Sequence, residues 1–212
     1  MARKLSPFQS WLNFTDKHLS SEAVEHLKLG LHSFFSRYYT EAEKLDKASA
    51  IYGFLQERCM QTTESEALGV FIHVMRGLGA SLRGKHVLKE AWTKYKVQCA
   101  SLFDMEKAPE GFKFFYCLLR ISTKARNTSL GDQLKKKFCS PKYLNIDYRN
   151  IKNLPDLFIQ LYQSGFISER KTDHLKDVLV TFEALECLEI LNRYHKSVSL
   201  EPIPLAEKIQ CT

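Results

Sequence analysis

Residues 154 to 168 of this chain read LPDLFIQLYQSGFIS, an apolar run that ends in a serine and a glycine. The apolar residues Leu157, Phe158 and Leu161 recur at intervals of three and four, a spacing that predicts a helix with one buried face. Ser164-Gly165 then provides a helix stop, because glycine readily adopts the positive φ found at many helix ends. The stretch therefore predicts a short helix followed by a sharp change of chain direction.

The first half of the chain contains a similar stretch. The residues IYGFL, 51 to 55, are followed four residues later by Cys59-Met60, in parallel with residues 157 to 161 and the later Gly165-Phe166 pair. Self-similarity of this kind predicts a duplicated unit. No β-strand alternation is convincing anywhere in the chain. The sequence therefore predicts an all-α protein made of two tandem six-helix bundles.

Helix start signals recur along the chain and suggest its domain boundaries. Each is a Ser, Thr or Asp whose side chain can accept a hydrogen bond from the first helical turn. The clearest in the first half are Ser6, Ser20 or Ser21, Thr40, Asp46 and Thr63. The predicted domains are residues 1 to 98 and residues 108 to 197, and residues 198 to 212 are expected to form a flexible, Pro-containing tail.

Length and composition are those of a folded globular protein. The chain has 212 residues, of which 44% are hydrophobic and 12% aromatic, enough for one or two domains with a buried core. No apolar run reaches the roughly 18 residues of a membrane span, and the N-terminal residues lack the apolar core of a signal peptide. We therefore expect a protein of the cytoplasm, with the nucleus as the alternative, and no membrane partner.

The cysteine and histidine spacing predicts no metal site. The six cysteines are scattered and form no C-x-x-C pair, so we expect reduced and mostly buried thiols. His18, His26 and His32 lie in one region, but no H-x-x-x-H spacing or nearby cysteine pair completes a ligand set. No metal and no other cofactor is expected.

Positive charge is concentrated in the second half. The net charge is +7, and residues 113 to 152 carry ten Lys or Arg against Asp132 and Asp147. Such a segment is typical of a surface that binds nucleic acid, an anionic lipid or an acidic protein, and also of a plain solvated helix face. The aromatic residues that a nucleic-acid site there would use are Phe114, Phe115, Tyr143 and Tyr148.

Residues 79 to 85, GASLRGK, match the G-x-x-x-x-G-K pattern of a phosphate-binding loop. In that loop a Ser or Thr after the lysine ligates Mg²⁺, but this chain has His86 there. The two strands that the site requires would be residues 69 to 75 and residues 177 to 183, and both are more simply helical. We interpret the glycines as helix stops and expect no catalytic residues and no enzymatic activity.

Several stretches together resemble the death effector domain family. In the second half they are FKFFYCLLRIS from residue 112, LFIQLYQSGFIS from 157, HLKDVLVTF from 174 and LEILNRY from 188. In the first half FQSWL, LSSEAVEHLKLGL and YKVQ match more loosely. The resemblance implies the death fold for both six-helix units, in a tandem layout similar to that of the FLICE-inhibitory proteins.

The resemblance also implies a function. Proteins of this family bind other death effector domains, so this chain is expected to be a non-enzymatic adaptor or regulator of apoptosis. The expected partners are death effector domains of adaptors and initiator caspases, and self-association is a further expectation. The Q-A-C-x-G nucleophile of a caspase is absent from the sequence.

The family's Arg-x-Asp-Leu motif is degenerate in this chain. Counting back from the closing tyrosine of each unit places KHVL and ALEC at its position, and neither keeps both charges. In the family this motif joins an acid on the second helix in a charge network. The equivalent pairs here would be Lys85 with Glu22 or Glu25, and Glu186 with the run Lys135, Lys136 and Lys137.

An interface of this kind requires a small apolar patch rimmed by charge. Leu29 stands where the family commonly exposes a phenylalanine, with Lys28 beside it, but the position fits a core residue equally well. On the predicted fifth helix, His73 and Arg76 lie off the apolar stripe formed by Leu68, Phe71, Ile72 and Met75. These two side chains are the better predictions for an exposed contact.

Two other functions share these patterns. A caspase-recruitment-type adaptor has the same six-helix fold, although residues 157 to 168 favour the death effector domain. A nucleic-acid-binding helical protein would use residues 113 to 152, although no recognition helix or RNA-binding signature accompanies that segment.

Overall fold

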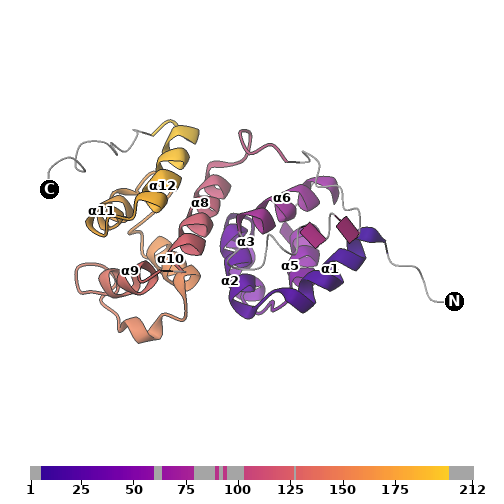
Figure 1. Cartoon of the computed structure of the whole chain (residues 1–212), viewed down its shortest axis with the longest axis horizontal. Helices are drawn as coiled ribbons and strands as arrows, with labels where there is room; N and C mark the ends of the chain where they lie inside the picture. The colour runs from indigo at the N-terminus through magenta and orange to yellow at the C-terminus, as the bar shows by residue number, and fades with distance from the viewer. Residues whose placement is uncertain are drawn as a thin grey trace. The chain divides into compact units, whose positions relative to one another are not determined.

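The computed structural model describes residues 6–59, 64–78, 89–90, 93–94, 103–126 and 128–200 (Figure 1). The chain divides into two compact units, Met1–Ala108 and Pro109–Thr212. The described residues form helices, turns and one isolated bridge between Ser168 and Lys171, without a β-strand, so the all-α prediction is confirmed. Within this described part, every helix is too short or too polar to cross a membrane.

The first unit is a set of short helices. In chain order they are α1 (Pro7–His18), α2 (Ser21–Gly30), α3 (His32–Phe35), the 3-10 turn η1 (Ser36–Tyr38), α4 (Tyr39–Ala42), α5 (Ala48–Phe54), the π-helical η2 (Leu55–Cys59) and α6 (Glu64–Gly77). Of the predicted sixth helix of this unit, residues 85 to 96, only residues 89–90 and 93–94 are among the described residues.

Aromatic side chains from three helices meet in the core of the first unit. The ring of Trp11 on α1 lies 6.0 Å from that of Phe71 on α6, and Tyr52 on α5 lies 5.3 Å from the same ring. Trp11 and Phe71 have no exposed area. Burying each of these large side chains stabilises the fold by roughly 2–3 kcal/mol, so this cluster joins the unit's first helix to its last described one.

Residues 69 to 75 were interpreted either as the strand before a phosphate-binding loop or as part of a helix, and the structure supports the helix. They lie inside a single α-helix, so the strand that a phosphate-binding loop requires is not formed there. Phe71, Ile72 and Met75 are buried as predicted, whereas Leu68, the fourth predicted core residue, is half-buried. Val70 and Val74 are buried as well. A helix that is apolar on most faces is a core helix. The glycines and the lysine of residues 79 to 85 lie outside the described residues.

Two of the predicted helix caps are confirmed and two are wrong. The side chain of Ser6 accepts from the Gln9 amide, and that of Ser20 accepts from the Ala23 amide. Thr40 instead lies within α4, and Asp46 does not cap α5, whose N-cap residue is Lys47. The predicted cap at Thr63 lies outside the described residues.

The start of α5 is capped by a residue from another helix. The carboxylate of Asp16 on α1 accepts a hydrogen bond of 2.9 Å from the Ser49 amide and a second from the Ser49 hydroxyl. One side chain thereby satisfies the first turn of α5 and ties it to α1. A local sequence pattern cannot reveal this cap, because the two residues are 33 positions apart.

The second unit follows the predicted order more closely. Its elements are α8 (Glu110–Ala125), α9 (Leu130–Phe138), the 3-10 turn η5 (Tyr148–Asn150), α10 (Leu154–Gln163), α11 (Asp173–Thr181) and α12 (Leu185–Ser197). The turn η5 occupies the place of the short predicted segment before residue 154. Residues 177 to 183 include the end of α11, so they form no strand, and the tail beyond Leu200 lies outside the described residues.

Helix α8 carries most of the core of the second unit. It contacts α9, α10 and α12, and the contact with α12 is the most extensive. Phe114 and Phe115 are buried on it, with ring centroids 6.0 and 4.9 Å from that of Tyr162 on α10. The ring of Phe114 also lies 5.7 Å from that of Tyr194 on α12. These rings hold the three helices together.

The end of α10 has the geometry predicted for Ser164-Gly165. Gly165 has a φ of 71°, its amide donates to the Tyr162 carbonyl, and the Phe166 amide donates to the Leu161 carbonyl. This pair of hydrogen bonds is the Schellman motif, in which the residue at positive φ is usually glycine. Ile167 follows and is fully buried, so the turn returns the chain to the core.

Replacing Gly165 by alanine is expected to destabilise the second unit by about 1 kcal/mol, because an L side chain is disfavoured at this positive φ. The matched control is Gly53→Ala, at a helical position where a Cβ would meet nothing within 4 Å. That change is expected to stabilise by roughly 0.5 kcal/mol. Urea unfolding followed by circular dichroism measures both, and equal stability of the Gly165 variant and the wild type would contradict the assignment.

Replacing Asp16 by alanine is expected to destabilise the first unit by about 1–2 kcal/mol, because two part-buried donors of Ser49 lose their acceptor. Both tryptophans of the sequence belong to the first unit, so tryptophan fluorescence during urea unfolding reports on it specifically. Asp46→Ala is the control, because this exposed carboxylate was the cap predicted from sequence. An equal loss in both variants would refute the long-range cap.

Candidate functional site

The predicted contact residues of α2 lie largely inside the first unit. Leu29 has no exposed area, so of the two interpretations left open for it the structure supports the core residue. Lys28 is only 8% exposed. Its ammonium group lies 2.6 Å from the Glu25 carboxylate and donates to the Glu43 carbonyl at 2.9 Å. Lys28 therefore fastens α2 to the segment after α4 and is not available to a partner.

The remaining first-unit candidates are more accessible. Arg76 is exposed at the end of α6, as predicted. His73 is half-buried, and its ring lies 5.6 Å from that of Phe103. Glu22 and Glu25 are both half-buried on α2. Lys85, their predicted partner, lies outside the described residues, so the charge network of the first unit stays a prediction.

The charge network predicted for the second unit is wrong in its pairing. Glu186, at the start of α12, forms its ion pair with Lys124 on α8 at 3.0 Å. Lys135 pairs with Asp132 on its own helix at 3.1 Å. The prediction of a Glu186 contact with the lysine run failed because α12 packs against α8, which brings a different lysine to it.

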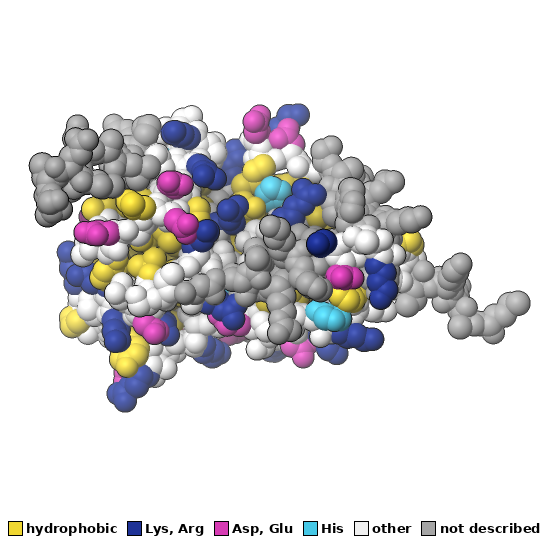
Figure 2. Space-filling model, in the orientation of Figure 1, with side chains coloured by type: hydrophobic (Ala, Val, Ile, Leu, Met, Phe, Trp, Pro, Cys, Tyr) yellow, Lys and Arg dark blue, Asp and Glu magenta, His cyan; other side chains and the backbone are white. Residues whose placement is uncertain are grey.

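A basic surface surrounds the turn between α9 and α10. We use this name for Lys136, Lys137, Lys142, Tyr148 and Lys152, all of them exposed. The ammonium group of Lys136 lies 6.0 Å from the centre of the Tyr148 ring, a cation–π distance. Figure 2 shows Lys and Arg side chains gathered beside a hydrophobic one at the lower left, where this turn protrudes. The predicted basic segment is therefore a real feature of the surface.

The aromatic residues expected to support nucleic-acid binding lie mostly in the core. Phe114 and Phe115 are 0% and 1% exposed, and Tyr143 is 8% exposed. Tyr148 alone of the four is exposed, at 44%. Because base stacking requires accessible rings, three of the four predicted stacking residues are wrong.

A second surface feature lies where α11 turns into α12. We call it the acidic corner and define it as Asp177, Val180, Glu183, Leu185 and Glu186. Val180 is 38% and Leu185 47% exposed, and Glu183 adopts a φ of 51° at the turn. This patch was missed from the sequence. Val180 falls outside the buried set of Leu175, Val178 and Leu179, and that offset from the helical stripe is the signal that would have indicated it.

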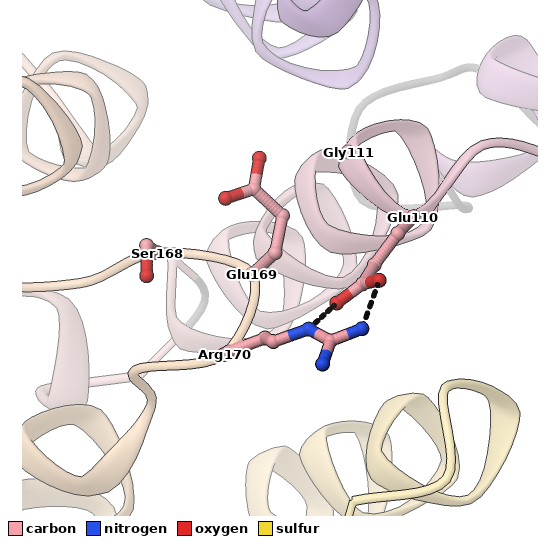
Figure 3. Close-up of a pocket in the computed structure, with 5 residues that line it drawn as sticks. All are labelled: Glu110, Gly111, Ser168, Glu169 and Arg170. Atoms are coloured by element: carbon pink, nitrogen blue, oxygen red, sulfur yellow. Dashed lines mark hydrogen bonds and ion pairs between the residues drawn. The ribbon is translucent and has the colours of Figure 1, made fainter.

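One shallow pocket of about 510 Å³ lies in the second unit between the start of α8 and the loop after α10. Figure 3 shows its five lining residues, with Arg170 turned toward Glu110 and the Glu169 side chain pointing away from that pair. The Arg170 guanidinium donates two hydrogen bonds to the Glu110 carboxylate, at 3.1 and 3.2 Å. These bonds fasten the loop to α8.

Tyrosine hydroxyls hold the same loop from the other side. Tyr194 donates to the backbone carbonyl of Glu169, and Tyr162 donates to the Glu169 carboxylate at 3.1 Å. Burial, reinforced by the Glu169 carboxylate, raises the pKa of both phenols, so they remain donors across the physiological range. The Glu110, Glu169 and Arg170 side chains of this pocket therefore hold the loop in place.

Thiols and histidines of the described residues have structural surroundings. Cys117, Cys139 and Cys187 are buried free thiols. Burial raises the pKa of Cys59 and of Cys187 to about 11, which keeps both protonated and unreactive near neutral pH. Within the described ranges no group of His, Cys, Asp and Glu is arranged to hold a metal ion.

Comparison with known proteins adds no relative: no protein-family model, curated protein or solved structure matches this chain.

His32, at the start of α3, is expected to make the first unit sensitive to acid. It is 5% exposed, and burial lowers its pKa from 6.5 to about 4. Because the folded value is the lower one, the unfolded chain binds the proton more readily between about pH 4 and 6.5. The free energy of unfolding therefore has its full value above this window and decreases as the pH falls, by about 2 kcal/mol at pH 5.

Urea unfolding followed by tryptophan fluorescence at about pH 7.5 and about pH 5 measures this loss. His32→Phe removes the titrating group while keeping a ring beside Tyr39, which lies 5.2 Å from the imidazole. In this variant, lowering the pH is expected to reduce the free energy of unfolding much less, because most of the roughly 2 kcal/mol contributed by His32 is gone. A variant with the same loss as the wild type would show that another group is responsible.

Proposed function

We propose that this chain is a non-enzymatic adaptor or regulator of apoptosis that binds the death effector domains of adaptors or initiator caspases. In this proposal each unit is a six-helix death-fold bundle, and the protein acts in the cytoplasm. The observation that carries it is the resemblance of residues 157 to 168, together with the local structure of that stretch. It forms α10 and a Schellman turn at Gly165, followed by the buried Ile167.

The surface chemistry of the second unit supports binding to another protein. The described residues with large exposed apolar side chains are Tyr148, Val180 and Leu185, and each stands among charged groups. A small apolar centre within a charged rim is the usual anatomy of a protein interface. Homotypic association would bury such a centre, while the charges around it select the partner and its orientation.

The basic surface favours one second candidate, binding to nucleic acid. Its four lysines can neutralise phosphates, and such contacts do not require a particular sequence. A single exposed aromatic side chain is little support for stacking, because the other three rings of the segment are in the core. For this reason the protein partner is the better supported of the two.

The test is binding of the purified full chain to isolated death effector domains from an adaptor and from an initiator caspase, measured by biolayer interferometry. We expect saturable binding, with a dissociation constant in the micromolar range typical of small interfaces. Arg76→Glu and Glu186→Lys reverse one exposed charge on each unit. At least one of them is expected to weaken binding about tenfold or more, or about 1.4 kcal/mol.

Lys47→Glu is the matched control, because this lysine is exposed and its side chain makes no described contact. It is expected to bind like the wild type. A chain that ignores every death effector domain at about 100 μM, yet binds polynucleotide with a steep salt dependence, would replace this proposal with the nucleic-acid function.

A further inference from the structure

The second unit carries two exposed apolar sites with opposite charges around them. Tyr148 belongs to the basic surface, whereas Val180 and Leu185 belong to the acidic corner. These three are the described residues whose large apolar side chains remain well exposed. Exposed apolar side chains among charges mark sites of association.

The basic surface has unsatisfied positive charge. Arg149 forms a bidentate pair with Asp147, and Lys135 pairs with Asp132, so these four charges cancel locally. The ammonium groups of Lys137 and Lys152 form no ion pair with the described residues, and Lys136 and Lys142 contact only tyrosine rings. Four cations are therefore left for a partner with negative charge.

The acidic corner has the complementary arrangement. The carboxylates of Asp177 and Glu183 form no ion pair with the described residues and are exposed. Glu186 adds a third carboxylate, which is only partly neutralised by Lys124 because the pair is open to solvent. The two aliphatic side chains of the corner lie between these acids in the sequence.

We propose that the partner of the basic surface is the acidic corner of a second copy of this chain. In this contact Tyr148 of one copy packs on Val180 and Leu185 of the next, while lysines 136 and 137 face Asp177 and Glu183. The two surfaces have opposite charge, and each exposes apolar side chains that the contact would bury.

Among the described residues no ion pair joins the two surfaces, so neither neutralises the other within one molecule. Both belong to the same folded unit, and Figure 1 shows the turn between α9 and α10 at the lower edge of that unit, with α11 and α12 at its upper left. A contact between unlike surfaces is heterologous, so it generates an open chain or a ring.

The test is sedimentation velocity of the full chain from about 10 to about 300 μM, the range in which a small interface becomes populated. We expect the mass to rise with concentration and to fall again in about 1 M salt, where charges are screened beyond about 3 Å. The basic-surface variant is Lys136→Glu with Lys137→Glu, and the acidic-corner variant is Asp177→Asn with Leu185→Ser. Each is expected to be monomeric, with association weakened at least about tenfold.

Mixing the two variants tests the head-to-tail arrangement directly. Each variant retains one intact surface, so an equimolar mixture is expected to form a dimer that cannot grow further.

Tyr148→Ser, which leaves the charge unchanged at an exposed turn, is a second basic-surface variant and is expected to behave like the first. The charge-matched control is Lys47→Glu with Lys196→Glu, two exposed lysines outside both surfaces, and it is expected to associate like the wild type.

Three results would overturn the proposal. In the first, the wild-type chain stays monomeric at about 300 μM. In the second, the mixture of the two variants stays monomeric. In the third, a monomeric chain binds polynucleotide through the basic surface. This inference does not depend on the proposed function. A chain that self-associates without binding death effector domains would refute that function alone, and one that binds them without self-associating would refute this contact alone.

Discussion

The burial of the aromatic face of α8 is the interaction on which the second unit depends. Phe114 and Phe115 fill the space between α8, α10 and α12, and their rings contact Tyr162 and Tyr194. Packing fixes these two tyrosines, and their hydroxyls donate to the backbone and the carboxylate of Glu169. The loop between α10 and α11 is thereby fixed, and the same packing removes the rings of α8 from the surface.

The burial of the α8 side chains limits which apolar groups are left on the surface of the second unit. Because most faces of α8 are buried, the large apolar side chains that remain exposed among the described residues lie on peripheral turns, namely the turn between α9 and α10 and the corner between α11 and α12. Both carry charges that the fold does not neutralise, and both expose apolar side chains. The distribution suits shallow contacts with other proteins more than enclosure of a small molecule, since ligand sites bury most of their ligand.

The sequence predicted those features that depend on neighbouring residues. The caps at Ser6 and Ser20, and the turn at Gly165, involve residues three or four positions apart, and they are present as predicted. Features that depend on distant residues were missed or mispredicted. Asp16 caps a helix 33 positions away, and Glu186 pairs with Lys124 because α8 and α12 pack together. Helical periodicity could not show whether Leu29 is buried or exposed, since α2 is buried on most of its faces.

Hydrogen–deuterium exchange of the full chain, with and without a death effector domain, is the most direct test. It asks whether the peripheral turns of this helical protein recognise such a domain, as we propose. We expect slower exchange in residues 136–152 or 177–186, and little change in α8, whose amides lie in a mostly buried helix. Unchanged exchange in both segments with a death effector domain, together with slower exchange in residues 136–152 when an oligonucleotide is added, would contradict this proposal.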